Sequence, residues 1–331
     1  MERRAQAGLV ASLALAAGLA GFVPGQFRWG RVAEWKLRDA HVLLTPARTP
    51  PEILIVAVDE ASTEALPEPL MFWHGYYASS IERLARAGTK VIALDMVFAV
   101  PVERWAPGLD ARLAAAAARA EEAGTPVFVG TAALARQREQ ERAVPLNLLA
   151  ASLERLVDVS LGADEDDFVR RVRLTSEAGL PALARAAAEA FVGRELGVTD
   201  GEIEIRHAGP AGTVARISLK EWLGLDEAAA RQRAAGKIAL IGADLPMDRH
   251  ATPYYAFRAG LPANTAGVEI HASAIATLLG GNARREAPGW VRALSQCALA
   301  GAALLLAWRR RGRRGGGGGG VGAGGGGGGA R

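Results

Sequence analysis

Residues Ile53 to Val58 read ILIVAV, an unbroken apolar run bounded by Pro51 before it and by Asp59 and Glu60 after it. The run is rich in β-branched residues and shows no alternation with polar ones. This pattern is typical of a strand that is buried on both faces, as in a parallel sheet. The run therefore predicts an α/β fold.

The segment after this strand predicts a crossover unit. Apolar residues recur at helical spacing in MFWHGYYASSIERLARAGTK, and Gly88 stands where a helix C-cap would be. A second apolar run, Val91 to Leu94, ends at Asp95. Strand, helix and strand in this order form a right-handed unit with two parallel strands.

The pattern then repeats along the chain. Helices are expected at Leu109 to Ala123, at Leu180 to Phe191 and within Gly267 to Leu279, and further strands at Pro126 to Gly130 and Lys237 to Ile241. Glu202 to His207 and Val214 to Leu219 alternate like an antiparallel hairpin. We expect a predominantly parallel sheet with flanking helices and an antiparallel addition.

Both ends of the chain carry apolar runs with arginines beside them. Arg3 and Arg4 precede a charge-free run from Ala5 to Phe27, which predicts a membrane anchor or, alternatively, a cleavable signal peptide. Trp29 and Trp35 suit an interfacial aromatic belt and favour the uncleaved anchor.

The second apolar run, residues 293–308, is followed at once by RRRGRR, which predicts a transmembrane helix with a cytoplasmic end. We expect the α/β domain between two transmembrane helices of a bacterial inner (cytoplasmic) membrane, on the periplasmic or extracellular side. The expected parts are an N-terminal stub and anchor (1–28), the outer domain (29–288), a transmembrane helix (289–308) and a flexible cytoplasmic Arg/Gly-rich tail (309–331).

The charge distribution argues against nucleic-acid binding. The net charge is +4, but six arginines and no acidic residue follow the last apolar run, and removing these six charges leaves −2 for the rest. Such a body lacks an extended basic surface. With one cysteine, Cys297, the chain can form neither an intrachain disulfide nor a cysteine metal cluster.

Acidic residues follow three of the expected strands, namely Asp59 with Glu60, Asp95, and Asp244. The loop after the last strand adds Asp248, Arg249 and His250, and His271 lies in the final helix. These side chains could cap backbone N–H groups, line a ligand or ion pocket beyond the carboxyl ends of the strands, or perform acid–base chemistry.

The turn LGADEDDFVRRVRL contains Asp164, Asp166 and Asp167, but Phe168 stands where a calcium loop would continue. We interpret it as a solvated acidic turn that leads into a basic strand. The sequence contains no GxSxG, HExxH or phosphate-loop lysine motif, so no catalytic residue, metal ligand or cofactor is assigned.

The order of these motifs resembles a known family. ILIVAVDEAS, VIALDMVF, the acidic turn with VRRV, LPALA, KIALIGADLPMDRHATP and GVEIHASAIATLLGG follow one another as in the type-two CHASE domain, an extracellular sensory domain associated with cyclases and histidine kinases. The resemblance singles out polar residues without a catalytic role: Asp59, Glu60, Ser62, Asp95, Asp248, Thr252, Pro253, Glu269 and His271. LPEPLMFWHGYY replaces the Trp-Pro-Trp-Pro-Arg segment of many members, and no effector domain follows.

The resemblance implies a sensory input domain of a bacterial transmembrane receptor, not an enzyme, that responds to a small-molecule or physical stimulus. We expect it to work as a homodimer at the membrane. The main alternative is a metal-dependent hydrolase that uses the strand-end carboxylates. A structural envelope protein that needs no ligand is a third hypothesis.

Overall fold

The structure is a computed structural model that describes residues 8, 12–13, 15–16, 27–98, 100–131, 155–198, 200–255, 264–281, 283 and 287–315. The chain divides into two compact units, Lys36–Glu286 and the two ends Met1–Trp35 with Ala287–Arg331. The first unit holds the α/β domain that the sequence predicts.

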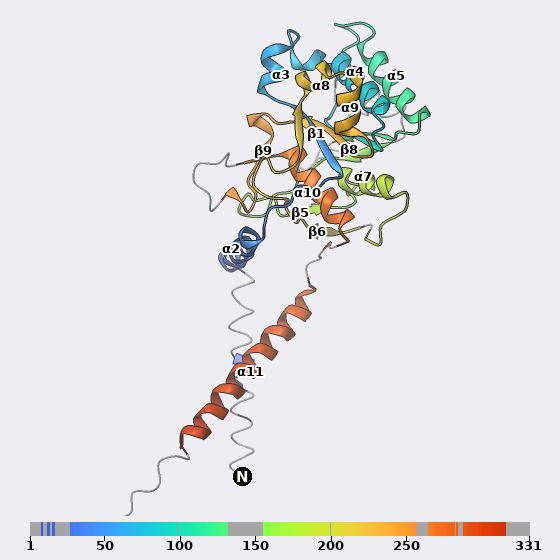
Figure 1. Cartoon of the computed structure of the whole chain (residues 1–331). Coiled ribbons are helices and arrows are strands. Elements are labelled where there is room, and N and C mark those ends of the chain that lie inside the picture. Colours follow the sequence, from blue (N-terminus) through green and yellow to red (C-terminus); the bar gives the residue numbers. More distant parts are fainter. Residues whose placement is uncertain are drawn as a thin grey trace, which may run out of the picture. The chain divides into compact units, whose positions relative to one another are not determined.

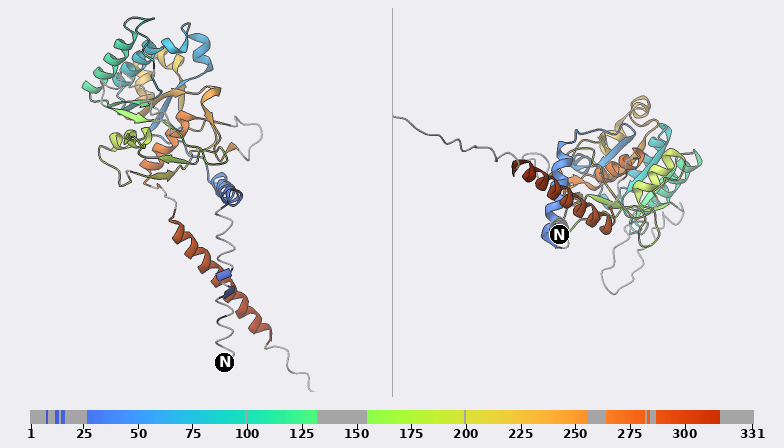
Figure 2. Two further views of the ribbon diagram at one scale, coloured as in Figure 1. Left: turned by 180° about the vertical axis from the view of Figure 1, so that it is seen from behind. Right: turned by 90° about the horizontal axis from the view of Figure 1, so that it is seen from below.

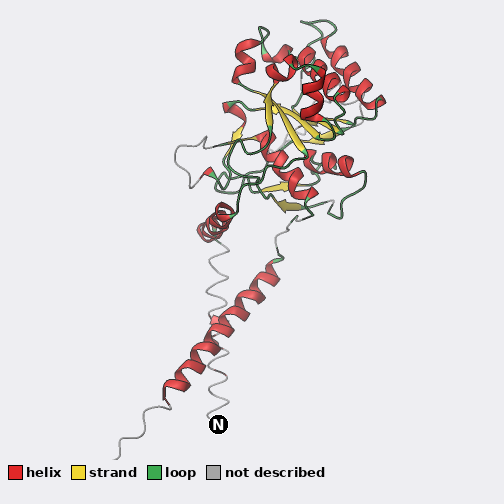
Figure 3. Ribbon diagram, viewed as in Figure 1, coloured by secondary structure: helices red, strands yellow, loops and turns green. Residues whose placement is uncertain are grey.

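A six-stranded sheet, parallel throughout, forms the centre of this domain (Figures 1 and 3). In spatial order its strands are β4 (Leu156–Asp158), β3 (Val127–Thr131), β2 (Val91–Asp95), β8 (Ile238–Ala243), β1 (Ile53–Val58) and β7 (Arg216–Ser218). Strand β1 has the predicted bounds, and all six of its residues are buried. The expectation of a parallel sheet buried on both faces is confirmed.

Helices cover both faces of the sheet (Figures 1 and 2). One face packs against α4 (His74–Arg86), α5 (Leu109–Glu122), α8 (Leu219–Gly224) and α9 (Glu227–Ala234). The opposite face packs against α7 (Leu183–Val192) and α10 (Gly267–Leu279). Successive residues of β1 therefore alternate between two separate cores, as the period of a strand requires.

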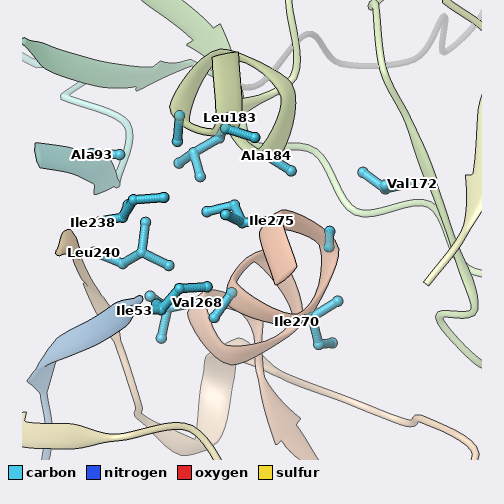
Figure 4. Packing of buried hydrophobic residues seen from close by; sticks show 14 of the residues in the cluster. Ile53, Ala93, Val172, Leu183, Ala184, Ile238, Leu240, Val268, Ile270 and Ile275 are labelled. Carbon is cyan, nitrogen blue, oxygen red and sulfur yellow. The ribbon is translucent and has the colours of Figure 1, made fainter. Parts of the chain in front are cut away.

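The core under α7 and α10 is made of small and branched side chains. Figure 4 shows Ile53, Ile238 and Leu240 of the sheet directed toward Val268 and Ile275 of α10 and toward α7. All five side chains are at most 1% exposed. These contacts fix α10, which carries two of the predicted site residues, against the centre of the sheet.

Short elements complete the domain. They are α3 (Glu60–Ala65), the 3-10 helices η2 (Leu70–Phe72) and η3 (Pro246–Asp248), the pair β5 (Arg171–Arg173) and β6 (Glu202–Glu204), and the pair β9 (Arg249–His250) and β10 (Thr265–Ala266). Both pairs are antiparallel, so the expected antiparallel addition exists, and β6 lies within the predicted segment 202–207 although its partner differs.

The predicted hairpin of residues 202–207 and 214–219 is wrong. Strand β6 pairs with β5, and β7 joins the main sheet parallel to β1. The segment between them donates backbone hydrogen bonds to side chains of α10: Arg206 N to Thr277 Oγ1 (3.0 Å), Ala208 N to Ser273 Oγ (3.2 Å) and Val214 N to Glu269 (3.0 Å). Helix α10 thus takes the place of a partner strand.

The predicted helix from Leu180 begins only at Leu183. The preceding residues extend the β-structure, because Asp158 N donates to Pro181 O (2.9 Å) and Ala182 N to Leu174 O (2.9 Å). At the other end Gly193 adopts a left-handed conformation (φ +69°), which confirms the predicted C-cap.

The other unit contains α11 (Gly289–Gly315), and helix α2 (Arg28–Leu44) runs from it into the α/β domain. Within the described residues, none of the helices combines the length and the apolar character needed to cross a membrane. The two transmembrane helices expected from the sequence are therefore not shown. Most of the predicted N-terminal anchor lies outside the described residues.

Close packing of α10 on β8 gives a first prediction. A Cβ on Gly242 would lie 2.7 Å from Cβ and Cγ2 of Val268 and 3.1 Å from Cβ of Asp95. We expect Gly242→Ala to lower the free energy of unfolding by about 1–3 kcal/mol, because the helix must shift. Urea denaturation of the full chain in detergent measures this. Gly224→Ala is the control, since a Cβ there meets nothing within 4 Å; equal losses would contradict the packing argument.

Candidate functional site

The carboxyl edge of the parallel sheet carries most of the polar residues that the sequence singled out. The connection after β1 leads to α4 on one face, whereas the connection after the neighbouring β8 leads to α10 on the other. Adjacent strands whose connections diverge in this way form a topological switch point. In open α/β sheets, ligands bind in the crevice at such a point.

Asp59 is the N-cap residue of α3, and its side chain connects this helix to the sheet. Its Oδ1 accepts hydrogen bonds from Ser62 N (2.9 Å), Ser62 Oγ (2.6 Å) and Ser218 Oγ (2.8 Å). Ser62 is fully buried, and Ser218 is the last residue of β7. One oxygen of Asp59 therefore has a capping role, and Ser62 links α3 to the edge strand. Glu60, the next residue, is exposed.

Glu269 lies in the first turn of α10 and is 2% exposed. Its carboxylate accepts hydrogen bonds from the backbone N–H of Gly212 (2.9 Å) and Val214 (3.0 Å), and from the guanidinium of Arg216. Glu269, Ser273 and Thr277 are spaced four residues apart, so they form one stripe along the helix. This stripe satisfies the backbone of the segment that precedes β7.

Two arginines extend this network to the switch point. Arg216 donates to Asp244 Oδ2 (2.5 Å) as well as to Glu269, and Arg249 donates to Asp244 Oδ1 (2.8 Å). Both oxygens of Asp244 are thus engaged. The network joins β7, the end of β8, β9 and α10.

A second group lies at the end of β2. His271 Nε2 is 3.6 Å from Asp95 Oδ1 and 3.2 Å from Val159 O, and His271 is 1% exposed. Burial raises the pKa of Asp95; a positive charge on His271 would lower it, and the carboxylate of Asp248 raises it further. Asp248 in turn lies 3.5 Å from His250. The net effect of burial and of these neighbours is a raised pKa of Asp95.

The eight predicted site residues do not form one cluster. Asp59, Glu60 and Ser62 lie at the end of β1, Asp95, Asp248 and His271 beside β2 and α10, and Glu269 in the arginine network. Thr252 is 1% exposed, with its hydroxyl 3.3 Å from that of Thr265. Asp59, Glu60 and Asp95 follow their strands as the sequence indicates, but the sequence did not show that the eight residues lie in separate groups.

An open cleft of about 600 Å³ lies at the switch point. Its lining residues are Asp59, Glu60, Ala61, Asp244, Pro246, Arg249 and Asn264. Of the eight predicted residues, only Asp59 and Glu60 line it. Arg249 and Asn264 are lining residues that the resemblance did not indicate.

The metal-dependent hydrolase finds no support in this geometry. Within the described ranges, no group of three or more His, Cys, Asp or Glu side chains is arranged to hold a metal ion. Asp59 Oδ1 is engaged by two serines, while Asp95 and His271 pair with each other. The strand-end carboxylates thus have separate partners.

The acidic turn is the part of the site region that the sequence misjudged. We expected it to be solvated, but Arg170 is 6% exposed and its guanidinium binds three carboxylates. Nε and Nη2 donate to the two oxygens of Asp39 (2.7 and 2.8 Å), and Nη1 donates to Asp164 (2.9 Å) and Asp166 (2.8 Å). Asp39 belongs to α2, so this cluster ties α2 to the α/β domain.

Further contacts balance the charges of this cluster. Lys36 Nζ lies 3.0 Å from Asp166 Oδ2 and 3.3 Å from the centre of the Phe168 ring, and Arg171 pairs with Asp164. Burial alone would raise the pKa of Asp166, but hydrogen bonds from Arg170 and Lys36 outweigh it and hold the pKa at about 2. Three cations therefore face three carboxylates, and the carboxylate of Asp166 remains ionised at neutral pH.

Comparison with known proteins identifies the family of this domain. A family model described as CHASE2 domain matches residues 10–308, and the chain belongs to this family. The suspected type-two CHASE domain is thereby confirmed. CHASE2 domains are extracellular sensory domains and not catalytic ones. No curated protein and no solved structure matches the chain.

The buried arginine gives a second prediction. Arg170→Met would leave the buried carboxylate of Asp39 and the half-buried Asp164 and Asp166 without their central cation, and we expect the free energy of unfolding to fall by about 3–5 kcal/mol. Chemical denaturation of the full chain in detergent measures the loss. Arg173→Met is the matched control, because this arginine lies three residues further on, in β5, has a 49% exposed side chain and should cost about 1 kcal/mol or less. Similar losses in both variants would refute a central role for Arg170.

His207 gives a third prediction, for pH. Burial lowers the pKa of His207 to about 4, although its hydrogen bond to Val169 O (3.1 Å) opposes the shift. The unfolded chain binds a proton near pH 6.5, so stability is complete above that pH and falls as the pH drops toward 4. We expect the unfolding free energy to fall by about 2 kcal/mol between pH 7 and pH 4.5 through this residue.

Denaturation curves at the two pH values, for the wild type and for His207→Gln, isolate this contribution. The glutamine amide can still donate to Val169 O but does not titrate. The wild type should lose more stability than the variant by about the stated amount. The same pH dependence in both proteins would show that His207 is not the group responsible.

Proposed function

We propose that this chain is the input part of a bacterial transmembrane signalling receptor. In this proposal a stimulus binds at the switch-point cleft outside the cytoplasm, and the change that it causes reaches α2. The membership of the CHASE2 family supports the sensory role. The contacts that lead from the cleft to Asp39 of α2 support a signal that passes from the cleft to this helix.

One continuous connection between the cleft and α2 carries the proposal. Arg249 lines the cleft, and two residues further on Ala251 O accepts a hydrogen bond from Val169 N (2.8 Å). The next residue, Arg170, holds Asp39 of α2 with two hydrogen bonds. A movement of the β8–β9 connection on ligand binding would thus be applied directly to the segment before β5 that anchors α2.

Helix α2 is a suitable receiver for such a movement. It is continuous with the N-terminal part of the chain, and Asp39, at 1% exposed, is its only buried residue among those described. A bidentate charge pair fixes orientation as well as distance. A small change in the position of Arg170 would therefore turn or shift α2 as a unit.

Membrane anchoring and orientation form part of the proposal. The apolar runs at both ends, with Arg3 and Arg4 before one and RRRGRR after the other, favour two anchors with cytoplasmic ends and a periplasmic domain between them. We also propose that the receptor works as a homodimer, because signals of this kind are commonly passed between paired helices.

A chimera tests the function and the orientation together. The full chain is fused at its C-terminal end to the catalytic domain of a cytoplasmic adenylate cyclase and expressed in a bacterium that lacks cyclases. Because ATP is cytoplasmic, cyclic AMP forms only if this end lies in the cytoplasm. We expect Asp39→Asn to change the basal output by about threefold or more, since it weakens the link to α2 without removing the side chain.

Asp167→Asn provides the matched control for this experiment. It makes the same chemical change in the acidic turn, at an exposed residue that does not contact Arg170 in the described hydrogen bonds. We expect its output to equal that of the wild type at equal protein levels. Absence of cyclic AMP from all three chimeras would contradict the orientation, and equal output from all three would contradict transmission through Asp39.

A further inference from the structure

We propose that the switch-point cleft binds a small aliphatic amine, whose ammonium group is held by Asp59 and Glu60. The proposal rests on the proposed sensory function, because it names the class of ligand for the same site. It follows from the volume of the cleft, from its charges and from the partners that its side chains already have.

The volume and the position of the cleft suit a small molecule. About 600 Å³ lies within the range of roughly 300–1,000 Å³ that ligand pockets occupy. The cleft is open to solvent at the carboxyl ends of β1 and β8, where an incoming molecule would contact elements that leave toward opposite faces of the sheet.

The charges of the lining favour a cation. Three carboxylates, of Asp59, Glu60 and Asp244, face one guanidinium, that of Arg249, so the lining has a net charge of −2. Two arginines use both oxygens of Asp244. The negative charge that remains available therefore belongs to Asp59 and Glu60.

The hydrogen bonds of these two residues leave acceptors free for a ligand. The three donors on Asp59 all reach Oδ1, and among the described residues no donor reaches Oδ2. Within the part of the chain that the structure describes, no donor reaches the carboxylate of Glu60 either; Thr63 Oγ1 donates to its backbone oxygen instead. Since the cap fixes Asp59, its free oxygen is held in place before any ligand arrives. Such preorganisation lowers the entropic cost of binding.

The remaining lining residues favour an organic cation over a metal ion. Ala61 and Pro246 offer hydrocarbon surface for an alkyl chain, and the amide of Asn264 can donate or accept one hydrogen bond. The described residues hold no group arranged to bind a metal ion. An ammonium with an alkyl body matches each of these surfaces.

Isothermal titration calorimetry of the full chain in phosphatidylcholine nanodiscs tests the proposal, with 1,4-diaminobutane as the probe. We expect saturable binding that empty nanodiscs lack. The neutral analogue 1,4-butanediol and inorganic phosphate should not bind. Because a hydrogen bond to a charged group is stronger than one to a neutral amide, Glu60→Gln should weaken the binding about tenfold or more.

Two further variants keep the result decisive. Glu64→Gln changes an exposed glutamate of the same helix that does not line the cleft, and should leave the affinity unchanged. Ala61→Phe should occupy part of the cleft beside Asp59 and Glu60 and weaken the binding. No saturable binding of the diamine, equal weakening by Glu60→Gln and Glu64→Gln, or tighter binding of phosphate would each overturn the proposal.

Hydrogen exchange of residues 36–44, with and without saturating diamine, separates this proposal from the function on which it rests. Diamine binding that Glu60→Gln weakens, without a change of exchange in α2, would support the ligand class and contradict transmission to α2. A change of exchange in α2 with diamine that Glu60→Gln and Ala61→Phe leave intact would overturn the proposed site while the sensory function stands.

Discussion

A parallel sheet must be covered on both of its faces, and the rest of this domain follows from that constraint. Each strand of the centre is apolar throughout, so helices are needed on either side. Connections that leave adjacent strands β1 and β8 must then diverge. The divergence opens a crevice at the carboxyl ends of the two strands. Polar side chains can gather there because no helix covers it.

Some backbone N–H groups of the domain donate hydrogen bonds to side chains of a helix and not to a neighbouring strand. Among the described residues, the segment 206–214 before β7 pairs with no strand. Its amides instead reach Glu269, Ser273 and Thr277 along α10. A helix that is buried almost entirely thus carries a polar stripe, and the arginine network begins at the first residue of that stripe.

The sequence allows the sheet to be predicted far better than the ion network. The apolar composition of the run from Ile53 to Val58 is enough to predict that both of its faces are buried. Asp59 and Glu60 directly follow this strand and therefore lie at the carboxyl edge of the sheet. The pair of Arg170 and Asp39 spans 131 residues, and nothing local distinguishes Asp39 from a solvated aspartate. The false hairpin has the same cause, since the side chains of α10 that accept hydrogen bonds from the segment between β6 and β7 lie more than 50 residues away.

Because Arg170 is buried, salt affects its ion pairs less than it affects the exposed charges of the domain. Mobile ions screen exposed charges within about 10 Å at 0.1 M ionic strength, but they reach a buried pair far less. The acidic cleft is open, whereas the side chains of Arg170 and Asp39 are 7% and 1% exposed. A rise in external salinity would therefore weaken the attraction of the cleft for a cation and leave the attachment of α2 almost unaltered. The carboxylates of the cleft and the pair of Arg170 and Asp39 thus lie in different dielectric environments.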